Sequence, residues 1–157
     1  MLRTVIIRSA IMLAVLFGLF VIMLAVRSAM AKRPADLGLA EGRLRPCPAS
    51  PNCVCSQDAD DAHKIEPLVF AGPPEEAMAK LKAVIDKMPR ARVVTAEANY
   101  LHAEFTSRIF RFVDDVEFAL DPENKQIHVR SASRTGYSDL GVNRRRVESI
   151  RGTFGGK

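Results

Sequence analysis

The sequence predicts an α+β domain: a four-stranded antiparallel sheet with helices on one face, preceded by one N-terminal transmembrane helix. Two observations carry this prediction. Four segments of alternating apolar and polar residues are joined in pairs by short turns, which connect antiparallel neighbours. A long uncharged apolar run stands near the N-terminus. The chain is thereby divided into an anchor or signal segment (1–33), a linker (34–46) and a globular domain (47–157).

The N-terminal apolar run covers residues 9–26 and contains no charged residue. A helix of this length reaches about 27 Å, the low end of a bilayer span. A water-soluble core of this size has no need for a helix that is apolar on every face. We expect a retained signal anchor. The alternative is a signal peptide cleaved after Ala31, because Ala29-Met30-Ala31 has the small-x-small pattern.

The positive charge of the chain belongs to the anchor segment and not to the globular domain. The net charge is +5. The first 33 residues hold five basic residues and no acid, so the remainder is electrically neutral. The five are Arg3, Arg8, Arg27, Lys32 and Arg33. A neutral domain does not attract phosphate backbones, so we expect no nucleic-acid partner.

Three cysteines lie in a proline-rich stretch that cannot be helical. Turn residues between Cys47 and Cys53 bring the two within bridging range, and a disulfide there would contribute about 2 kcal/mol. It would require an oxidising compartment, which predicts an inner-membrane protein with its C-terminal domain in the periplasm. Cys55 is then a free thiol that we expect to be open to alkylation. A zinc site of the three cysteines and His63 is the alternative, although the spacing is not a standard one.

Two amphipathic helices are predicted, one before the four strands in sequence and one after them. Residues 73–88 begin with prolines and acids and carry an apolar stripe, and Pro89 ends them. The last helix is expected to begin near residues 138–139. It carries three apolar residues on one face, Val147, Ile150 and Phe154. Residues 65–70 are a candidate edge strand.

The four strands are predicted at residues 92–97, 100–106, 115–120 and 127–133. Their alternation assigns one face to the core. The core side chains are Leu101, Ala103, Phe105, Val116, Phe118, Leu120, Ile127 and Val129. The opposite face carries Tyr100, His102, Glu104, Asp115, Glu117, His128 and Arg130. We expect this face to be solvated and salt-bridged. A ligand-binding face, or a metal site of its histidines and glutamates, is the alternative.

From residue 126 onward, seven basic residues face two acids. One interpretation is a network in which arginines of this segment pair with Asp114, Asp115 and Glu117. The other is an anion-binding site, because the segment also holds a Ser/Gly-rich loop before a helix. The candidate residues for that site are Arg130, Ser131, Ser133, Arg134, Tyr137, Asn143, Arg144 and Arg146.

Three stretches resemble a bacterial family, the domain of unknown function 1499. They are CPASPNCV (47–54), FVDDVEF (112–118) and RSASRTGYSDLGVNRRR (130–146). The resemblance implies no activity that could be carried over to this chain. The family usually has serine where this sequence has Cys55.

Two classes of function remain open. The first is a non-catalytic module of the envelope that binds an anionic ligand or a protein partner. The second is an envelope hydrolase, in which His102 or His128 would act with Glu104 or Asp115 on the sheet face. The sequence contains no nucleophile motif and no cofactor motif, so the first class is favoured and no cofactor is expected.

Overall fold

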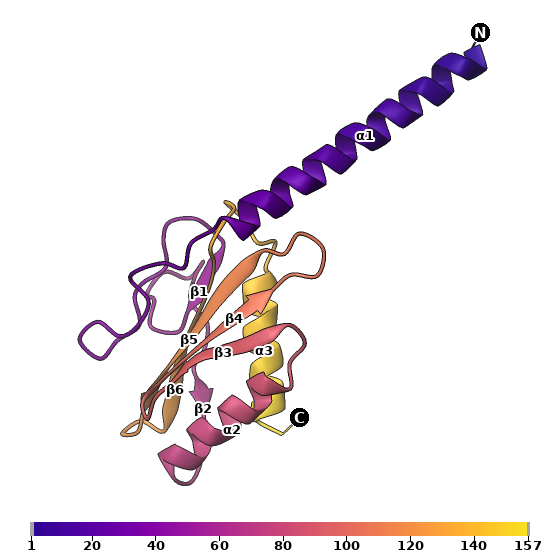
Figure 1. Cartoon of the computed structure of the whole chain (residues 1–157). Coiled ribbons are helices and arrows are strands. Elements are labelled where there is room, and N and C mark those ends of the chain that lie inside the picture. Colours follow the sequence, from indigo (N-terminus) through magenta and orange to yellow (C-terminus); the bar gives the residue numbers. More distant parts are fainter. Residues whose placement is uncertain (1, 157) are drawn as a thin grey trace.

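The computed structural model describes residues 2–156 and consists of a long helix followed by one α+β domain (Figure 1). The helices are α1 (Leu2–Ala29), α2 (Pro74–Asp86) and α3 (Val142–Phe154). The strands are β1 (Cys53–Cys55), β2 (Leu68–Val69), β3 (Ala91–Ala96), β4 (Tyr100–Thr106), β5 (Val113–Asp121) and β6 (Gln126–Ser133). The predicted fold class and all four predicted strands are confirmed.

The sheet is antiparallel throughout and has six strands, where four were predicted. Its order is β1-β6-β5-β4-β3, and β2 also pairs with β6. The two additional strands, β1 and β2, are three and two residues long, too short to show an alternating pattern, and only β2 lies in a stretch that the sequence offered as a candidate edge strand. Within the predicted edge strand 65–70, the paired residues are 68–69, and Pro67, directly before them, has no N–H to donate.

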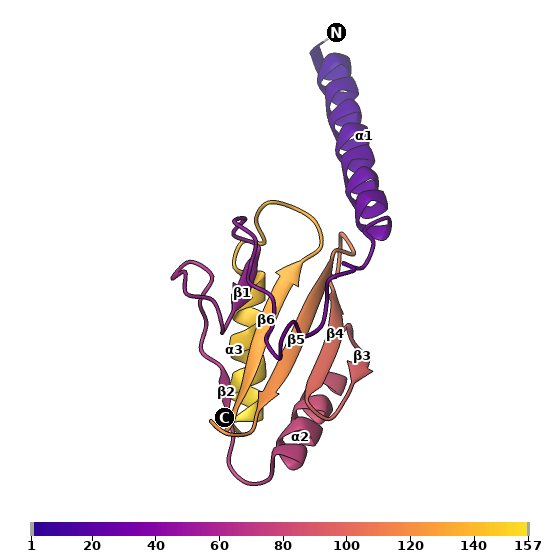
Figure 2. The same cartoon turned by 90° about the vertical axis from the view of Figure 1, so that its left-hand side faces the viewer.

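Helices α2 and α3 lie on one face of the sheet and enclose the hydrophobic core (Figure 2). The alternation predicted this face correctly. Seven of its eight core side chains are buried, and Leu120 packs partly buried against them. From the helices, Leu81, Ile85, Val147 and Ile150 are fully buried. Each such side chain contributes about 1.5–3 kcal/mol by leaving water, so this face supplies most of the stability.

Helix α3 begins at Val142, later than the start predicted near residues 138–139. Gly141, directly before it, has a φ of +77°, which lies outside the helical region and prevents an earlier start. Asp139 still serves the helix, because its Oδ2 accepts the backbone N–H of Asn143 at 2.6 Å. The carboxylate thereby satisfies one of the N–H groups that a helix start leaves unpaired.

Helix α1 projects away from the domain (Figure 1). Residues 3–28 are long and apolar enough to cross a membrane, and the most apolar part of the helix is not buried against the rest of the chain. Its last turn touches the domain, since the Ser28 hydroxyl donates to the Arg111 carbonyl at 2.5 Å.

The face of the sheet opposite the helices is crossed by residues 33–47, which we call the strap (Figure 2). The strap contains no helix or named strand, only a bridge between Ala40 and Arg43. Its Leu44 is 4% exposed and packs in a small second core. The partners of Leu44 there are Cys55, Tyr100 and Ala119. Most of the strap is the segment expected to be a linker, and in the structure it packs on the domain.

Candidate functional site

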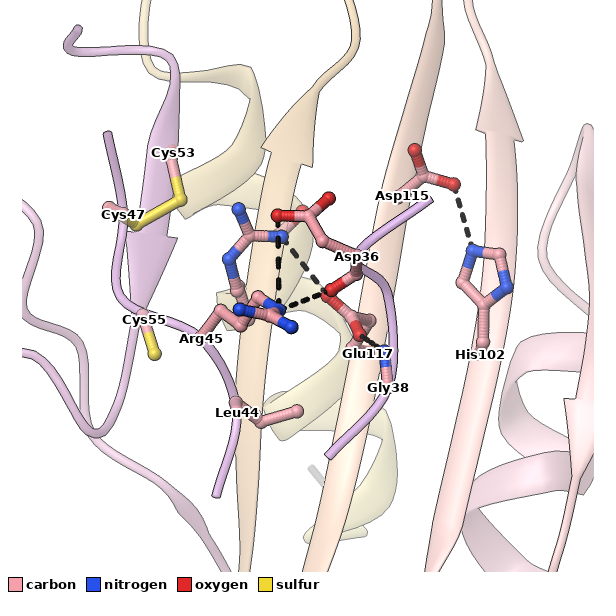
Figure 3. Close-up of polar contacts among 12 residues, drawn as sticks. Asp36, Gly38, Leu44, Arg45, Cys47, Cys53, Cys55, His102, Asp115 and Glu117 are labelled. Carbon is pink, nitrogen blue, oxygen red and sulfur yellow. Dashed lines mark hydrogen bonds and ion pairs between the residues drawn. A yellow bond between two sulfur atoms is a disulfide. The ribbon is translucent and has the colours of Figure 1, made fainter. Parts of the chain in front are cut away.

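The charged face of the sheet is buried, although the sequence predicted a solvated face. His102 is 3% exposed, and Asp115 and Glu117 are each 1% exposed. The strap excludes water from this face, and its covering side chains come from a stretch without any apolar periodicity. Figure 3 shows residues of the strap lying over Glu117, with His102 directed toward Asp115 from the neighbouring strand.

Asp115 is the centre of a buried polar network. It accepts Nε of Arg134 at 2.7 Å on one oxygen, and Nη2 of Arg134 at 2.6 Å on the other. His102 Nε2 lies 2.8 Å from the second oxygen. Burial alone would raise the pKa of Asp115, but hydrogen bonds from Arg134 and His102 outweigh burial and lower this pKa. Asp115 is therefore held as a carboxylate.

Glu104 accepts hydrogen bonds from three arginines at the edge of the same network. Its Oε1 accepts Arg134 Nη2 at 2.5 Å and Arg33 Nη2 at 2.7 Å, and its Oε2 accepts Arg92 Nη2 at 2.6 Å. Burial would raise the pKa of Glu104, yet hydrogen bonds from Arg92, Arg134 and Arg33 lower it to about 2. Through Arg33, this carboxylate ties the start of the strap to the sheet.

Glu117 ties the middle of the strap. Its Oε1 accepts the Tyr100 hydroxyl and the backbone N–H of Gly38, both at 2.8 Å. Its Oε2 accepts Arg130 Nη1 at 3.0 Å from the register partner on β6. Burial and the neighbouring Glu117 charge raise the pKa of Tyr100, so the phenol stays neutral. Most polar groups on this face are hydrogen-bonded to one another, which is the arrangement of a structural scaffold.

The cysteine loop, residues 47–55, begins where the strap ends. A disulfide joins Cys47 to Cys53, and Cys55 is a free cysteine that is fully buried (Figure 3). Burial raises the pKa of the Cys55 thiol. His63, the fourth residue of the alternative zinc site, instead contacts Asp60 through Nδ1 at 2.6 Å. Within residues 2–156, no three His, Cys, Asp or Glu side chains are grouped to hold a metal ion.

The eight candidate residues of the anion site lie on both faces of the sheet. Arg130 and Arg134 point toward the strap, where both are paired with carboxylates. Ser131 and Ser133 point toward α3, because successive residues of a strand alternate between faces. Tyr137 is 76% exposed on the β6–α3 loop.

Arg144 belongs to neither set, because its guanidinium donates to the backbone carbonyls of Lys64 and Ala62, at 2.8 and 3.1 Å. The eight residues therefore do not form one pocket. The alternation that located the core also places Arg130 and Arg134 on the opposite face from Ser131 and Ser133. The sequence alone could therefore have shown that these residues do not share one site.

Ser131, Ser133, Asn143 and Arg146 do come together, in a buried cluster between β6 and α3. Asn143 is fully buried; its Oδ1 accepts the Ser131 hydroxyl at 2.6 Å and also Arg146 Nη1. Its Nδ2 donates to Ser133 Oγ at 3.0 Å and to the Asn52 carbonyl at 2.9 Å. This contact joins the cysteine loop to the start of α3, so two of the sequence motifs meet here.

A cleft next to this cluster, of about 340 Å³, combines arginines with apolar side chains. We call it the arginine cleft; it lies between the start of α3, the end of β4 and the α2–β3 turn. Its main lining residues are Met88, Arg90, Phe105, Asp114, Val142, Arg145 and Arg146. Sequence reasoning found Arg146 but missed Arg90, which is separated from α3 by half the domain in sequence.

The three arginines of the cleft differ in whether they are paired with a carboxylate. Arg146 pairs with Asp114 and lies over the Phe105 ring, at 4.9 Å from its centroid. Arg90 and Arg145 are exposed, and each donates only to a backbone carbonyl among the residues described. One carboxylate faces three guanidinium groups, so within residues 2–156 two positive charges of the cleft have no ion-pair partner.

A serine, a histidine and an aspartate lie in line at the opposite end of β6. Ser56 Oγ is 3.2 Å from His128 Nδ1, and His128 Nε2 is 3.6 Å from Asp121. The serine also accepts the backbone N–H of Val129 at 2.9 Å. Asp121 in addition holds the β5–β6 turn through Asn124. The second distance is longer than a hydrogen bond.

Comparison with known proteins agrees with the three sequence motifs. No curated protein matches the chain. A family profile matches residues 43–154, from the strap through the cysteine loop and the sheet to the end of α3. The match covers well over half of the chain and confirms the resemblance seen in the sequence. This chain therefore belongs to the family described as Protein of unknown function (DUF1499).

Proposed function

We propose that this protein is a non-catalytic binding module of the bacterial envelope. Helix α1 anchors it in the inner membrane, and the domain lies in the periplasm. There it binds an anionic ligand that also has an apolar part. The arginine cleft is the observation that carries this proposal, because it offers two unpaired guanidinium groups beside Phe105 and Met88.

Three features support the anchor and the compartment. Residues 3–28 have the length and hydropathy of a membrane span. The Cys47–Cys53 disulfide suits an oxidising compartment such as the periplasm. The contact of Ser28 with Arg111 supports a retained helix over cleavage after Ala31, because cleavage would remove Ser28 from the domain.

The cleft suits an anion better than the sheet face does. Arg130 and Arg134 already have carboxylate partners, and their side chains are only 14% and 8% exposed. Arg90 and Arg145 are exposed and can turn toward a phosphate or carboxylate without breaking an ion pair. The apolar side chains beside them would contact an alkyl or aromatic part of the ligand.

A reporter fusion tests the compartment. Alkaline phosphatase fused after Lys157 should be active, since it folds only where its disulfides form. Activity of a cytoplasmic reporter at the same position, with an inactive phosphatase, would show that the domain is not exported.

A titration tests the ligand class. The full chain in neutral phosphatidylcholine nanodiscs is titrated with hexyl phosphate, inorganic phosphate and hexanol. We expect saturable binding of hexyl phosphate, tighter than that of either part alone. Arg145→Gln should weaken it about tenfold or more, the effect of losing one charge-assisted hydrogen bond. Arg43→Gln is the matched control, since Arg43 is exposed and lies outside the cleft. An equal response of the two variants would exclude the cleft.

The hydrolase alternative has one observation in its favour, the alignment of Ser56, His128 and Asp121. His102 is less suited to catalysis, because it is buried and its Nε2 faces Asp115. A fluorophosphonate probe tests the alternative. Covalent labelling that disappears in Ser56→Ala would establish a serine nucleophile and overturn the non-catalytic proposal.

A further inference from the structure

The β4–β5 loop, residues 107–112, combines exposed apolar and basic side chains at the end of the domain where α1 leaves it (Figures 1 and 2). Ile109 is 69% exposed, and Arg108 and Arg111 are exposed. Phe110 and Phe112 pack against each other, with ring centroids 5.7 Å apart. The loop contains no acid.

The contact with α1 fixes the height of this loop relative to the apolar helix. Ser28, which donates to the Arg111 carbonyl, follows Val26 by two residues. Two residues of helix correspond to about 3 Å. The headgroup layer on each side of a bilayer is about 5–8 Å deep. If residues 9–26 span the hydrocarbon, the loop lies within the headgroup layer.

Charge and a second loop fit the same position. Arg27, Lys32, Arg108 and Arg111 make no ion pair within residues 2–156, so they are free for lipid phosphates. The β6–α3 loop reaches the same end of the domain (Figures 1 and 2). It contributes Leu140, which is 84% exposed, and Tyr137, a residue type typical of the membrane interface.

We infer that the β4–β5 loop, together with the β6–α3 loop, docks on the surface of the membrane that α1 spans and prefers anionic phospholipids. The side chains of Ile109, Phe110 and Phe112 enter the interfacial layer. The four basic side chains named above contact lipid phosphates. The domain is thereby held against the bilayer with the arginine cleft close to the headgroups. This inference rests on the proposed anchor and adds a lipid surface as partner.

The chain contains no tryptophan, so single tryptophans report on docking without background. The full chain is placed in nanodiscs with brominated lipids, which quench indole fluorescence on contact. Ile109→Trp is the reporter. Val69→Trp is the matched control, since Val69 is also 69% exposed but lies on β2 at the other end of the sheet. We expect emission from position 109 at least about twofold weaker than in unbrominated discs, and no change at position 69.

The lipid preference is tested in the same discs. Quenching at position 109 should be greater with phosphatidylglycerol than with phosphatidylcholine alone. In the background Arg108→Gln/Arg111→Gln, the equilibrium constant for docking should fall about fivefold for each arginine removed, and the preference for phosphatidylglycerol should weaken, with Arg27 and Lys32 supplying what remains.

Several outcomes would overturn the inference. Equal quenching at positions 109 and 69 would mean that this loop is not the part of the domain that docks, and no quenching at either would mean that the loop does not enter the bilayer. A residue at position 109 that is unquenched by lipid yet shielded from aqueous acrylamide would be covered by protein instead. Carbonate extraction of native membranes distinguishes a failure of docking from a failure of the membrane anchor. A chain that stays in the membrane with an unquenched position 109 is anchored but not docked, whereas an extracted chain would refute the anchor and docking together.

Discussion

Arg134 holds Asp115 at two points, with Nε and Nη2 each within 2.7 Å of a different carboxylate oxygen. The two side chains are 8% and 2% exposed, so the pair is shielded from water and salt. The same Nη2 also reaches Glu104 at 2.5 Å. A single guanidinium therefore joins two carboxylates on neighbouring strands, β4 and β5.

Replacing Arg134 by alanine should destabilise the domain strongly. The change leaves Asp115 buried without its cation, which typically costs about 3–5 kcal/mol. We expect the melting temperature, followed by circular dichroism, to fall by about 10 °C or more. Arg144→Ala is the control: its guanidinium binds two backbone carbonyls at the surface and should change stability by less than about 1 kcal/mol. Equal losses in both variants would contradict the assigned roles.

Acid should weaken the domain through Glu104. Its pKa is about 2 in the folded protein, against an ordinary value of 4.5. A lowered pKa stabilises the fold above the ordinary value, and this contribution is lost as the pH falls from about 5 toward 2. Glu104→Gln should therefore lower the unfolding free energy at pH 7 and make its pH dependence shallower, by at most about 1.4 kcal/mol per pH unit.

Urea unfolding between pH 2 and pH 7 measures this effect. Asp115 keeps part of the slope, because its pKa is lowered as well. Glu123→Gln, at an exposed position in the β5–β6 turn, should retain the slope of the parent protein. Parallel curves for parent and Glu104→Gln would show that the three arginines do not stabilise the glutamate charge.

The strap should behave as part of the domain in unfolding experiments. Leu44→Ala removes a side chain that is 4% exposed and packed on Tyr100 and Ala119, so we expect a loss of about 2 kcal/mol. Leu140→Ala, at a position 84% exposed, should have almost no effect. Chemical denaturation of both variants decides the matter, and an unchanged midpoint for Leu44→Ala would mean that the strap is a mobile linker.

Cys55 should resist alkylation in the folded protein, contrary to what the sequence suggested. The side chain is fully buried, and burial raises the pKa of its thiol, so little thiolate is available. Iodoacetamide followed by mass spectrometry should modify Cys55 only in denaturant. The Cys47–Cys53 pair should stay unmodified in both conditions without a reductant. Rapid modification of the native protein would place Cys55 at the surface.

The sequence by itself determined the fold class, the four main strands, the core face and the family. Each depends on local periodicity: alternation in residues 100–106 and 115–120 identifies the buried side chains, and an uncharged run of 18 residues identifies α1. The local turn chemistry around Pro51 also pointed to the Cys47–Cys53 bridge.

Only the tertiary structure decided what covers the charged face and which arginines remain free. The strap has no periodicity, because it is fixed by single contacts such as Gly38 with Glu117, across 79 positions of the chain. The arginine cleft likewise brings Arg90 beside Arg145, which only the packing of α3 against the sheet allows. Whether a charge is paired depends on neighbours distant in sequence, and a local pattern carries no information about them.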